Sequence, residues 1–254
     1  MRYLFENLDD VRALVHESRR TYVLLDCDGT LTPIMTEPRK VALGKSMSRV
    51  LTSLSSKPSC ILAIVSGRCL ADLRRLVNIK GIYYVGNHGL EIRGPGIMYT
   101  NETARNSRRS IAEISRMLRY LESVGAVIED KKLTLTVHFR QASPRVVPAI
   151  ESAVQRTLHS YSQLRMTRGK KVLEIRPRTE WNKGLAAQWL VNQLGKGLPI
   201  YAGDDRTDED AFSRLRKGIT ILMSRRRKPT FAKYRLNDYR DLGRFLRYLS
   251  LCLN

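Results

Sequence analysis

The sequence predicts an α/β fold: a doubly wound, mainly parallel sheet forms the core, and a smaller α+β domain is inserted into it. Continuous apolar runs of strand length alternate with helical patterns at both ends of the chain. The middle of the chain instead carries paired strand patterns, one of which alternates strictly between apolar and polar residues. We therefore expect a core built from residues 1–93 and 176–254, with the inserted domain at residues 94–175.

The first part of the core is expected to contain three strands and three helices. Each strand is an apolar run that is bounded by turn residues and fits burial on both faces. Each helix repeats apolar residues three and four positions apart. The strands are expected at 22–25, 60–65 and 82–85, and the helices at 8–19, 43–54 and 70–77.

The inserted domain has the predicted order α-β-β-α-β-β. It begins with a long basic amphipathic helix and continues with two strand pairs and a second helix. The second strand alternates between apolar residues such as Leu135 and polar ones such as Thr136, which predicts one buried face in an antiparallel sheet. The helices are expected at 104–124 and 146–159, and the strands at 126–129, 133–140, 163–167 and 171–175.

After Pro177 the alternation of helices and strands resumes. Helices are expected at 182–194, 208–215 and 238–251, and strands at 198–202 and 219–223. Strand–helix alternation on both sides of the insert implies parallel strands covered by helices on both faces.

Composition limits the compartment and the partners. No apolar run reaches the roughly 20 residues that a membrane helix needs, and acids interrupt the first ten residues where a signal peptide would be apolar. The four cysteines show neither zinc-ligand nor disulfide spacing. We expect a cytoplasmic monomer with no membrane contact.

The chain is strongly basic, with a formal net charge of +21. Such a charge favours anionic partners: a phosphorylated small molecule, nucleic acid or an acidic protein. The densest basic run is Ser224–Pro229, and no aromatic residues are interleaved with it as in a nucleic-acid surface. We therefore do not expect nucleic acid as the partner, while an acidic protein stays open.

Two aspartates, Asp26 and Asp28, end the first apolar run, and Gly, Thr and Pro follow them. In an extended chain these two side chains point the same way, and their mutual repulsion favours a bound cation such as Mg²⁺. One carboxylate could then attack an electrophile while the other transfers protons. A strand followed by an ordinary turn is the alternative for this motif.

Other polar residues follow buried strands in the same way. Ser66, Asn87 and Asp204 each follow the carboxyl end of a predicted strand by one or two residues, and Lys183 lies at the start of a predicted helix. Ligands of open α/β sheets bind at the carboxyl ends of the strands, so these residues are expected to converge with Asp26. A nucleophile, a proton donor, metal ligands, a hydroxyl and a cation together suit phosphoryl transfer. The alternative for each residue by itself is a helix cap or an ordinary surface position.

The order Asp-x-Asp-Gly-Thr, Ser, Lys and Gly-Asp-Asp-x-x-Asp resembles the haloacid dehalogenase superfamily of phosphatases, in which a larger α/β cap matches the insert. Three further stretches resemble the trehalose-6-phosphate phosphatase family within it. They are Gly86–Glu91, the Glu129–Lys131 hairpin leading to Val137–Arg140, and Gly169–Pro177. The resemblance covers the chain from about Tyr22 to Met223, and it implies Mg²⁺-dependent hydrolysis of trehalose 6-phosphate to trehalose and phosphate.

The resemblance also implies roles in the core. Asp26 would be the nucleophile that forms an aspartyl-phosphate, and Asp28 would protonate the leaving oxygen and then activate water. Ser66 and Lys183 would hold the phosphoryl oxygens. Mg²⁺ would be bound by Asp26, by Asp28 through its backbone carbonyl and by Asp204, with Asp208 in support.

In the cap, the resemblance implies that Glu129, Lys131 and Glu174 grip the sugar hydroxyls, while Asn87 and His88 lie where core and cap meet and could touch the substrate. An exposed sheet face with ordinary surface charge is the alternative for the cap residues. A sucrose 6-phosphate or mannosyl-phosphoglycerate phosphatase is the nearest alternative function. A non-catalytic subunit that docks through its basic surface, for example to an acidic synthase, is the alternative of another class.

Overall fold

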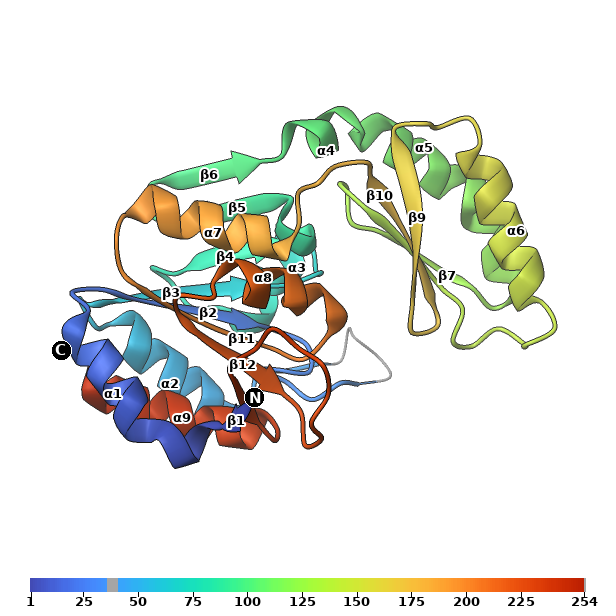
Figure 1. Ribbon diagram of the computed structural model, residues 1–254. Coiled ribbons are helices and arrows are strands. Elements are labelled where there is room, and N and C mark those ends of the chain that lie inside the picture. The colour runs from blue at the N-terminus through green and yellow to red at the C-terminus, as the bar shows by residue number, and fades with distance from the viewer. Residues whose placement is uncertain (36–40, 254) are drawn as a thin grey trace. The chain divides into compact units, whose positions relative to one another are not determined.

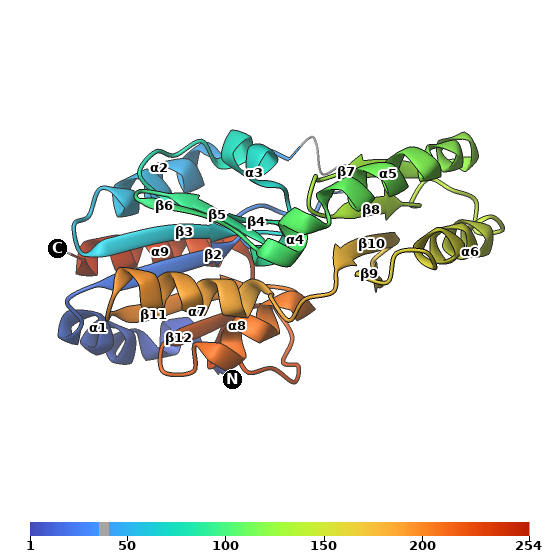
Figure 2. The same ribbon diagram turned by 90° about the horizontal axis from the view of Figure 1, so that it is seen from above.

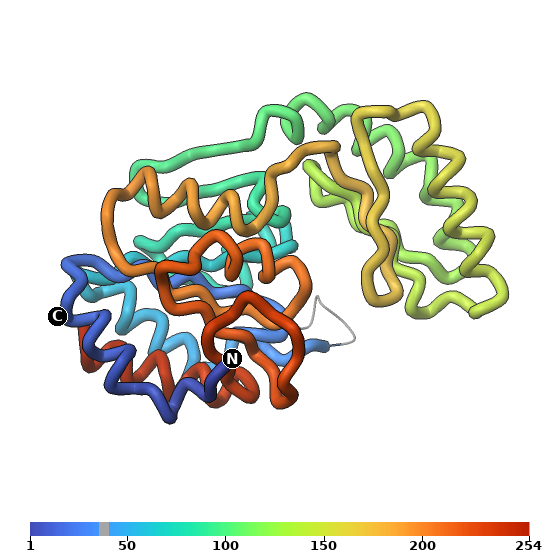
Figure 3. Tube along the Cα trace, viewed as in Figure 1, coloured from blue at the N-terminus to red at the C-terminus, as the bar shows by residue number. Residues whose placement is uncertain are grey.

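The computed structural model describes residues 1–35 and 41–253, and it divides into two compact units (Figure 1). The core unit comprises Met1–Tyr99 and Trp181–Asn254, and the cap unit comprises Thr100–Glu180. The predicted limits, after residues 93 and 175, lie a few residues earlier. The trace in Figure 3 shows the chain leaving the core unit once and returning once.

The core unit contains a nine-stranded sheet in the order β1-β13-β12-β11-β2-β3-β4-β5-β6. Pairing is parallel from β1 through β4, and β5 runs antiparallel to β4. The strands are β1 (Arg2–Tyr3), β2 (Thr21–Asp26), β3 (Cys60–Val65), β4 (Tyr83–Gly86), β5 (Glu91–Gly94), β6 (Ile97–Thr100), β11 (Leu198–Gly203), β12 (Ile219–Met223) and β13 (Tyr234–Leu236).

The strand order explains where a ligand would bind. From β2 the chain winds outward through β3 and β4, and after the cap unit it returns on the other side of β2 with β11 and β12. The sheet therefore reverses its winding between β2 and β11. In doubly wound folds the crevice at this point, outside the carboxyl ends of the strands, is where ligands bind.

Helices cover both faces of the core sheet because its central strands are apolar on both sides. In β2, Val23 and Leu25 pack into one hydrophobic cluster, and Tyr22 and Leu24 pack into the other. The first cluster includes α1 (Leu8–Glu17), α2 (Lys45–Ser55), α3 (Leu70–Val77) and α9 (Tyr239–Cys252). The second includes α7 (Lys183–Leu194) and α8 (Glu209–Arg214). Figure 1 shows α1, α2 and α9 side by side.

The cap unit is an antiparallel four-stranded sheet in the order β7-β8-β10-β9. Its helices α5 and α6 pack against one face through residues such as Ile114 and Val154 (Figure 2). The elements are α4 (Glu102–Asn106), α5 (Arg108–Leu118), the 3-10 helix η4 (Arg119–Val124), β7 (Val127–Asp130), β8 (Leu135–His138), α6 (Val147–Leu158), β9 (Leu164–Gly169) and β10 (Val172–Pro177).

Two expectations for the cap unit differ from the structure. The single helix expected at 104–124 is divided into α4, α5 and η4, and the Ser107 hydroxyl donates to the carbonyl of Thr103 at the first break. The strand expected to have one buried face is buried on both, because Thr136 lies in register between Glu129 and Glu174 on the polar face.

None of the helices within residues 1–35 and 41–253 combines the length and the apolar character that crossing a membrane requires.

Candidate active site

The parallel sheet brings three of the predicted residues to one edge. Asp26 is the last residue of β2, Ser66 directly follows β3, and Asp204 directly follows β11. Strand β2 lies between the other two, with Asp26 opposite Val65 and Leu25 opposite Ala202. These residues come from distant parts of the chain, and the strand order alone makes them neighbours.

A buried lysine links two of the carboxylates. Lys183 Nζ lies 2.7 Å from Asp26 Oδ1 and 2.9 Å from Asp208 Oδ1, and all three residues are at most 4% exposed. Lys183 is the first residue of α7, whose start is fixed because the Asn182 side chain accepts from the amide of Leu185. The cation is thus held at the strand ends by a capped helix.

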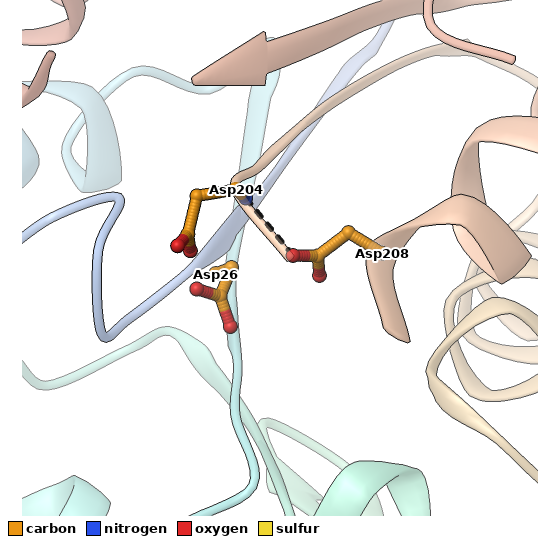
Figure 4. Close-up of side chains that lie close together, drawn as sticks. All are labelled: Asp26, Asp204 and Asp208. Atoms are coloured by element: carbon orange, nitrogen blue, oxygen red, sulfur yellow. Dashed lines mark hydrogen bonds between the residues drawn. The ribbon is translucent and has the colours of Figure 1, made fainter. Parts of the chain in front are cut away.

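Asp208 accepts four hydrogen bonds and organises the turn after β11. Its Oδ1 accepts from Lys183 Nζ and from the Tyr201 hydroxyl at 2.9 Å. Its Oδ2 accepts from the backbone amide of Asp204 at 3.0 Å (Figure 4) and from the backbone amide of Asp205 at 3.1 Å. A Cβ at Gly203 would lie 2.2 Å from Asp208 Cγ, so the close approach requires glycine there.

Asp26, Asp204 and Asp208 form an acidic cluster, in which one oxygen of each lies within 4.8 Å of the others (Figure 4). The Asp-Gly-Thr turn after β2 closes against it, because Thr30 Oγ1 donates to Asp204 Oδ1 at 3.3 Å. Gly29 adopts a φ of +89°, and a Cβ there would lie 2.3 Å from Asp204 Oδ2. The cluster is therefore a group of oxygen donors that could hold a metal ion.

Burial shifts the protonation of the cluster. It raises the pKa of Asp26 well above its ordinary value, with Lys183 opposing the shift and Asp208 adding to it. Burial, with repulsion from Asp208 and Asp205, raises the pKa of Asp204 to about 6. Burial alone would lower the pKa of Lys183, but Asp208 and Asp26 hold it well above its ordinary value. The single positive charge of Lys183 does not balance the three carboxylates of the cluster, and a bound divalent cation would neutralise the remaining negative charge.

The side chain of Asp28 lies outside this cluster. Arg68 Nε donates to Asp28 Oδ2 at 2.7 Å, and an Arg68 terminal nitrogen donates to Oδ1 at 2.6 Å. Strand β2 ends at Asp26, so the alternation that would have aligned Asp28 with Asp26 no longer applies. This bidentate pair between Arg68 and Asp28 was not predicted from the sequence.

Ser66, Asn87 and His88 lie on two neighbouring turns: Ser66 follows β3, and Asn87 and His88 follow β4. Ser66 Oγ accepts from the amide of Arg68 at 3.1 Å, so it also stabilises the turn after β3. Asn87 and His88 both have positive φ, at 48° and 57°, and the His88 amide donates to the Ser66 carbonyl. The Asn87 side-chain nitrogen Nδ2 donates to Glu91 Oε1 at 2.6 Å, which gives Asn87 a structural role that the sequence did not indicate.

The cap unit brings the other predicted residues together on the polar face of its sheet. Lys131 Nζ lies 3.9 Å from Glu129 Oε2 and 3.8 Å from Glu174 Oε1. Each glutamate also contacts a second nitrogen-bearing side chain: His138 Nε2 is 2.7 Å from Glu129, and an Arg176 nitrogen is 3.8 Å from Glu174. These five side chains form an alternating chain of charges and polar groups within the cap unit.

A family model described as trehalose-phosphatase matches residues 24–240. The chain belongs to the trehalose-phosphatase family. It is 36% identical, over 96% of its length, to trehalose-phosphate phosphatase B of Arabidopsis thaliana, and it covers 70% of that protein. The predicted family is confirmed, and with it the class of enzyme, a phosphoric monoester hydrolase.

Solved structures agree with this family. The C-terminal domain of trehalose-6-phosphate phosphatase from C. albicans superposes with a TM-score of 0.77 at 27% identity, over 96% of each chain. A haloacid dehalogenase-like hydrolase from Bacteroides thetaiotaomicron superposes with a TM-score of 0.66 at 15% identity, over 91% of this chain and 99% of its own. Because the sequence identity to this hydrolase is only 15%, the match shows the fold alone, and it confirms the predicted fold class.

Proposed function

We propose that this member of the trehalose-phosphatase family hydrolyses trehalose 6-phosphate to trehalose and phosphate, uses Mg²⁺, and forms an aspartyl-phosphate on Asp26. The observation that carries the proposal is the buried Asp26 carboxylate at the end of β2, paired with Lys183 beside Asp204 and Asp208. The similarity to trehalose-phosphate phosphatases indicates the substrate.

The acidic cluster fits Mg²⁺ by its chemistry, since Mg²⁺ prefers carboxylate oxygens and keeps several waters. Asp26 and Asp204 are the side chains that would hold it, together with the backbone carbonyl of Asp28. Asp208 already accepts four hydrogen bonds, so we assign it to positioning Lys183 and the Asp204 turn. Bound there, Mg²⁺ would supply charge neutralisation for the phosphoryl oxygens.

The residues of the core unit have complementary tasks. The Asp26 carboxylate attacks phosphorus in line with the bond to the sugar oxygen, which leaves, and water later cleaves the acyl phosphate. Lys183 orients Asp26 and, with Ser66, holds the phosphoryl oxygens. Asp28 donates a proton to the leaving oxygen and takes one from the attacking water. Since Arg68 occupies both oxygens of Asp28 in this structure, Asp28 must exchange that partner for the substrate first.

The direct test is phosphate release from trehalose 6-phosphate, sucrose 6-phosphate, glucose 6-phosphate and mannosyl-phosphoglycerate, with Mg²⁺ and after chelation. We expect a strong preference for trehalose 6-phosphate and a loss of activity on chelation that added Mg²⁺ reverses. Preference for another sugar phosphate would keep the chemistry and replace the substrate. Absence of release from all four would contradict the proposal.

Glu129, Lys131 and Glu174 are proposed to recognise the sugar, because carboxylates accept strong hydrogen bonds from hydroxyls. We expect Glu174→Gln to lower kcat/KM for trehalose 6-phosphate about 10- to 100-fold, the loss of one or two charge-assisted hydrogen bonds. Hydrolysis of p-nitrophenyl phosphate, which has no sugar, should be unchanged. Glu151→Gln on α6 is the matched control in the same unit, and equal kinetics of the two variants would contradict this role.

A further inference from the structure

The densest basic run of the chain lies beside the acidic cluster. We call residues Ser224–Lys228 the basic segment; it follows β12, which pairs in parallel with β11. Lys228 Nζ donates to the backbone carbonyl of Asp204 at 3.3 Å. Arg225 and Asp204 line the same pocket of about 410 Å³, together with Gly29. The fold thus places this run at the strand ends where the proposed reaction takes place.

Hydrogen bonds hold the basic segment in this position. The Ser224 hydroxyl donates to the carbonyl of Arg226 at 2.8 Å and accepts from its amide at 3.2 Å. Glu209, at the start of α8, accepts from the Thr230 hydroxyl at 2.7 Å and from the Phe231 amide at 2.8 Å. Because the loop is anchored on both sides, the exposed cations of residues 225–228 stay near Asp204.

The charges of the site itself oppose the approach of an anion. The strand-end residues described above comprise five carboxylates and two cations, so even with one Mg²⁺ their formal sum is negative. They are Asp26, Asp28, Asp204, Asp205, Asp208, Lys183 and Arg68. A phosphate monoester carries close to two negative charges at neutral pH. An approaching substrate therefore meets repulsion unless nearby cations reverse the sign of the field.

We propose that the basic segment captures the phosphate dianion of the substrate at the rim of the active site and raises its association rate. This inference rests on the proposed function and assigns Arg226 and Arg227 as the residues that act. The other two cations of the segment also hold the loop in place. Arg225 forms an ion pair with Asp238 at 3.1 Å, and Lys228 donates to the backbone carbonyl of Asp204. Fields of this kind raise association rates about 10- to 1,000-fold at low ionic strength.

Proximity distinguishes these cations from the general positive charge of the chain. The Debye length is about 8 Å at physiological ionic strength, so cations at the other edge of the sheet are screened from the site. Arg19 and Lys80 are exposed and precede the amino ends of β2 and β4. Across the length of β2, Arg19 lies about 20 Å from Asp26. Replacing Arg19 and Lys80 lowers the net charge of the chain as much as replacing Arg226 and Arg227 does, but it leaves the basic segment beside the active site unchanged.

The experiment compares Arg226→Gln/Arg227→Gln with Arg19→Gln/Lys80→Gln in the Mg²⁺-loaded full chain. We measure kcat and kcat/KM for trehalose 6-phosphate from about 25 to about 300 mM NaCl, where the Debye length falls from roughly 20 to roughly 6 Å. At low salt, kcat/KM of the Arg226→Gln/Arg227→Gln variant should be about 3- to 10-fold lower than that of the wild type, with kcat unchanged. The loss should shrink at high salt, and the control variant should match the wild type.

The outcomes separate this inference from the proposed function. Equal kcat/KM of both double variants at low salt, with an active wild type, would overturn the inference and leave the function in place. A loss that persists at high salt would also overturn it, since that indicates a local structural effect. A wild type without phosphatase activity on trehalose 6-phosphate would contradict the proposed function itself. Inhibition by trehalose, which is uncharged, should be equal in all three proteins.

Discussion

Replacing Asp26 with Asn is expected to lower turnover of trehalose 6-phosphate by at least about 1,000-fold, because the amide cannot attack phosphorus. The change preserves shape, and burial already raises the pKa of Asp26 well above its ordinary value, so a neutral side chain is tolerated there. Lys183 also contacts Asp208 at 2.9 Å, and we expect this contact to persist in the variant. We therefore expect loss of activity without loss of the fold.

Three measurements check this prediction: phosphate release, thermal unfolding, and acid-quenched detection of phosphorylated protein. The wild type should yield a phosphorylated chain during turnover, and Asp26→Asn should yield none. Asp9→Asn, on the exposed face of α1, removes a carboxylate outside the site and should behave as the wild type. An Asp26→Asn protein that keeps more than about a tenth of the activity would contradict the nucleophilic role.

Replacing Lys183 with Met is expected to have the largest effect on stability. Lys183 is 3% exposed, and its removal leaves the buried carboxylates of Asp26 and Asp208 without their cation. Breaking a buried ion pair from one side costs about 3–5 kcal/mol. For a chain of this size that corresponds to a decrease in Tm of roughly 6–20 °C. Turnover should also be lost, because Lys183 orients Asp26.

Tryptophan fluorescence during urea unfolding measures this effect, since Trp181 and Trp189 both belong to the core unit. Lys217→Met, at an exposed position, is the matched control and should leave the midpoint unchanged. The double variant Lys183→Met/Asp208→Asn should be more stable than the sum of its single changes predicts, because it removes one of the unpaired charges. Strict additivity of the two changes would contradict the proposed coupling.

The central strands of the core could be predicted from the sequence. The bounds of β3 (Cys60–Val65) and β12 (Ile219–Met223) agree with the predicted ones, because strands buried on both faces are unbroken apolar runs that turn residues delimit. Strands β1, β5, β6 and β13 were not predicted. They are two to four residues long, too short for a clear hydrophobic period, and their pairing with neighbouring strands defines them.

The strand order also made part of the site predictable. Asp26, Ser66 and Asp204 lie at the carboxyl ends of strands of one parallel sheet, and a doubly wound arrangement brings such ends to one edge. Lys183 could be added because it begins a helix after the insert. These predictions required only that each residue lies at the carboxyl end of a strand or at the start of a helix.

The contacts between side chains, in contrast, could not be predicted and depend on the three-dimensional structure. Asp28 pairs with Arg68 because β2 ends at Asp26 and the chain then turns, so the two-residue alternation does not extend to Asp28. Asp208 receives four hydrogen bonds from donors that are distributed over three segments. The basic segment could be identified in the sequence as a run of Arg and Lys. Its position beside Asp204 depends on β12 lying next to β11. Periodicity fixes which face a residue occupies, whereas contacts between segments depend on where each strand ends and how each turn is closed.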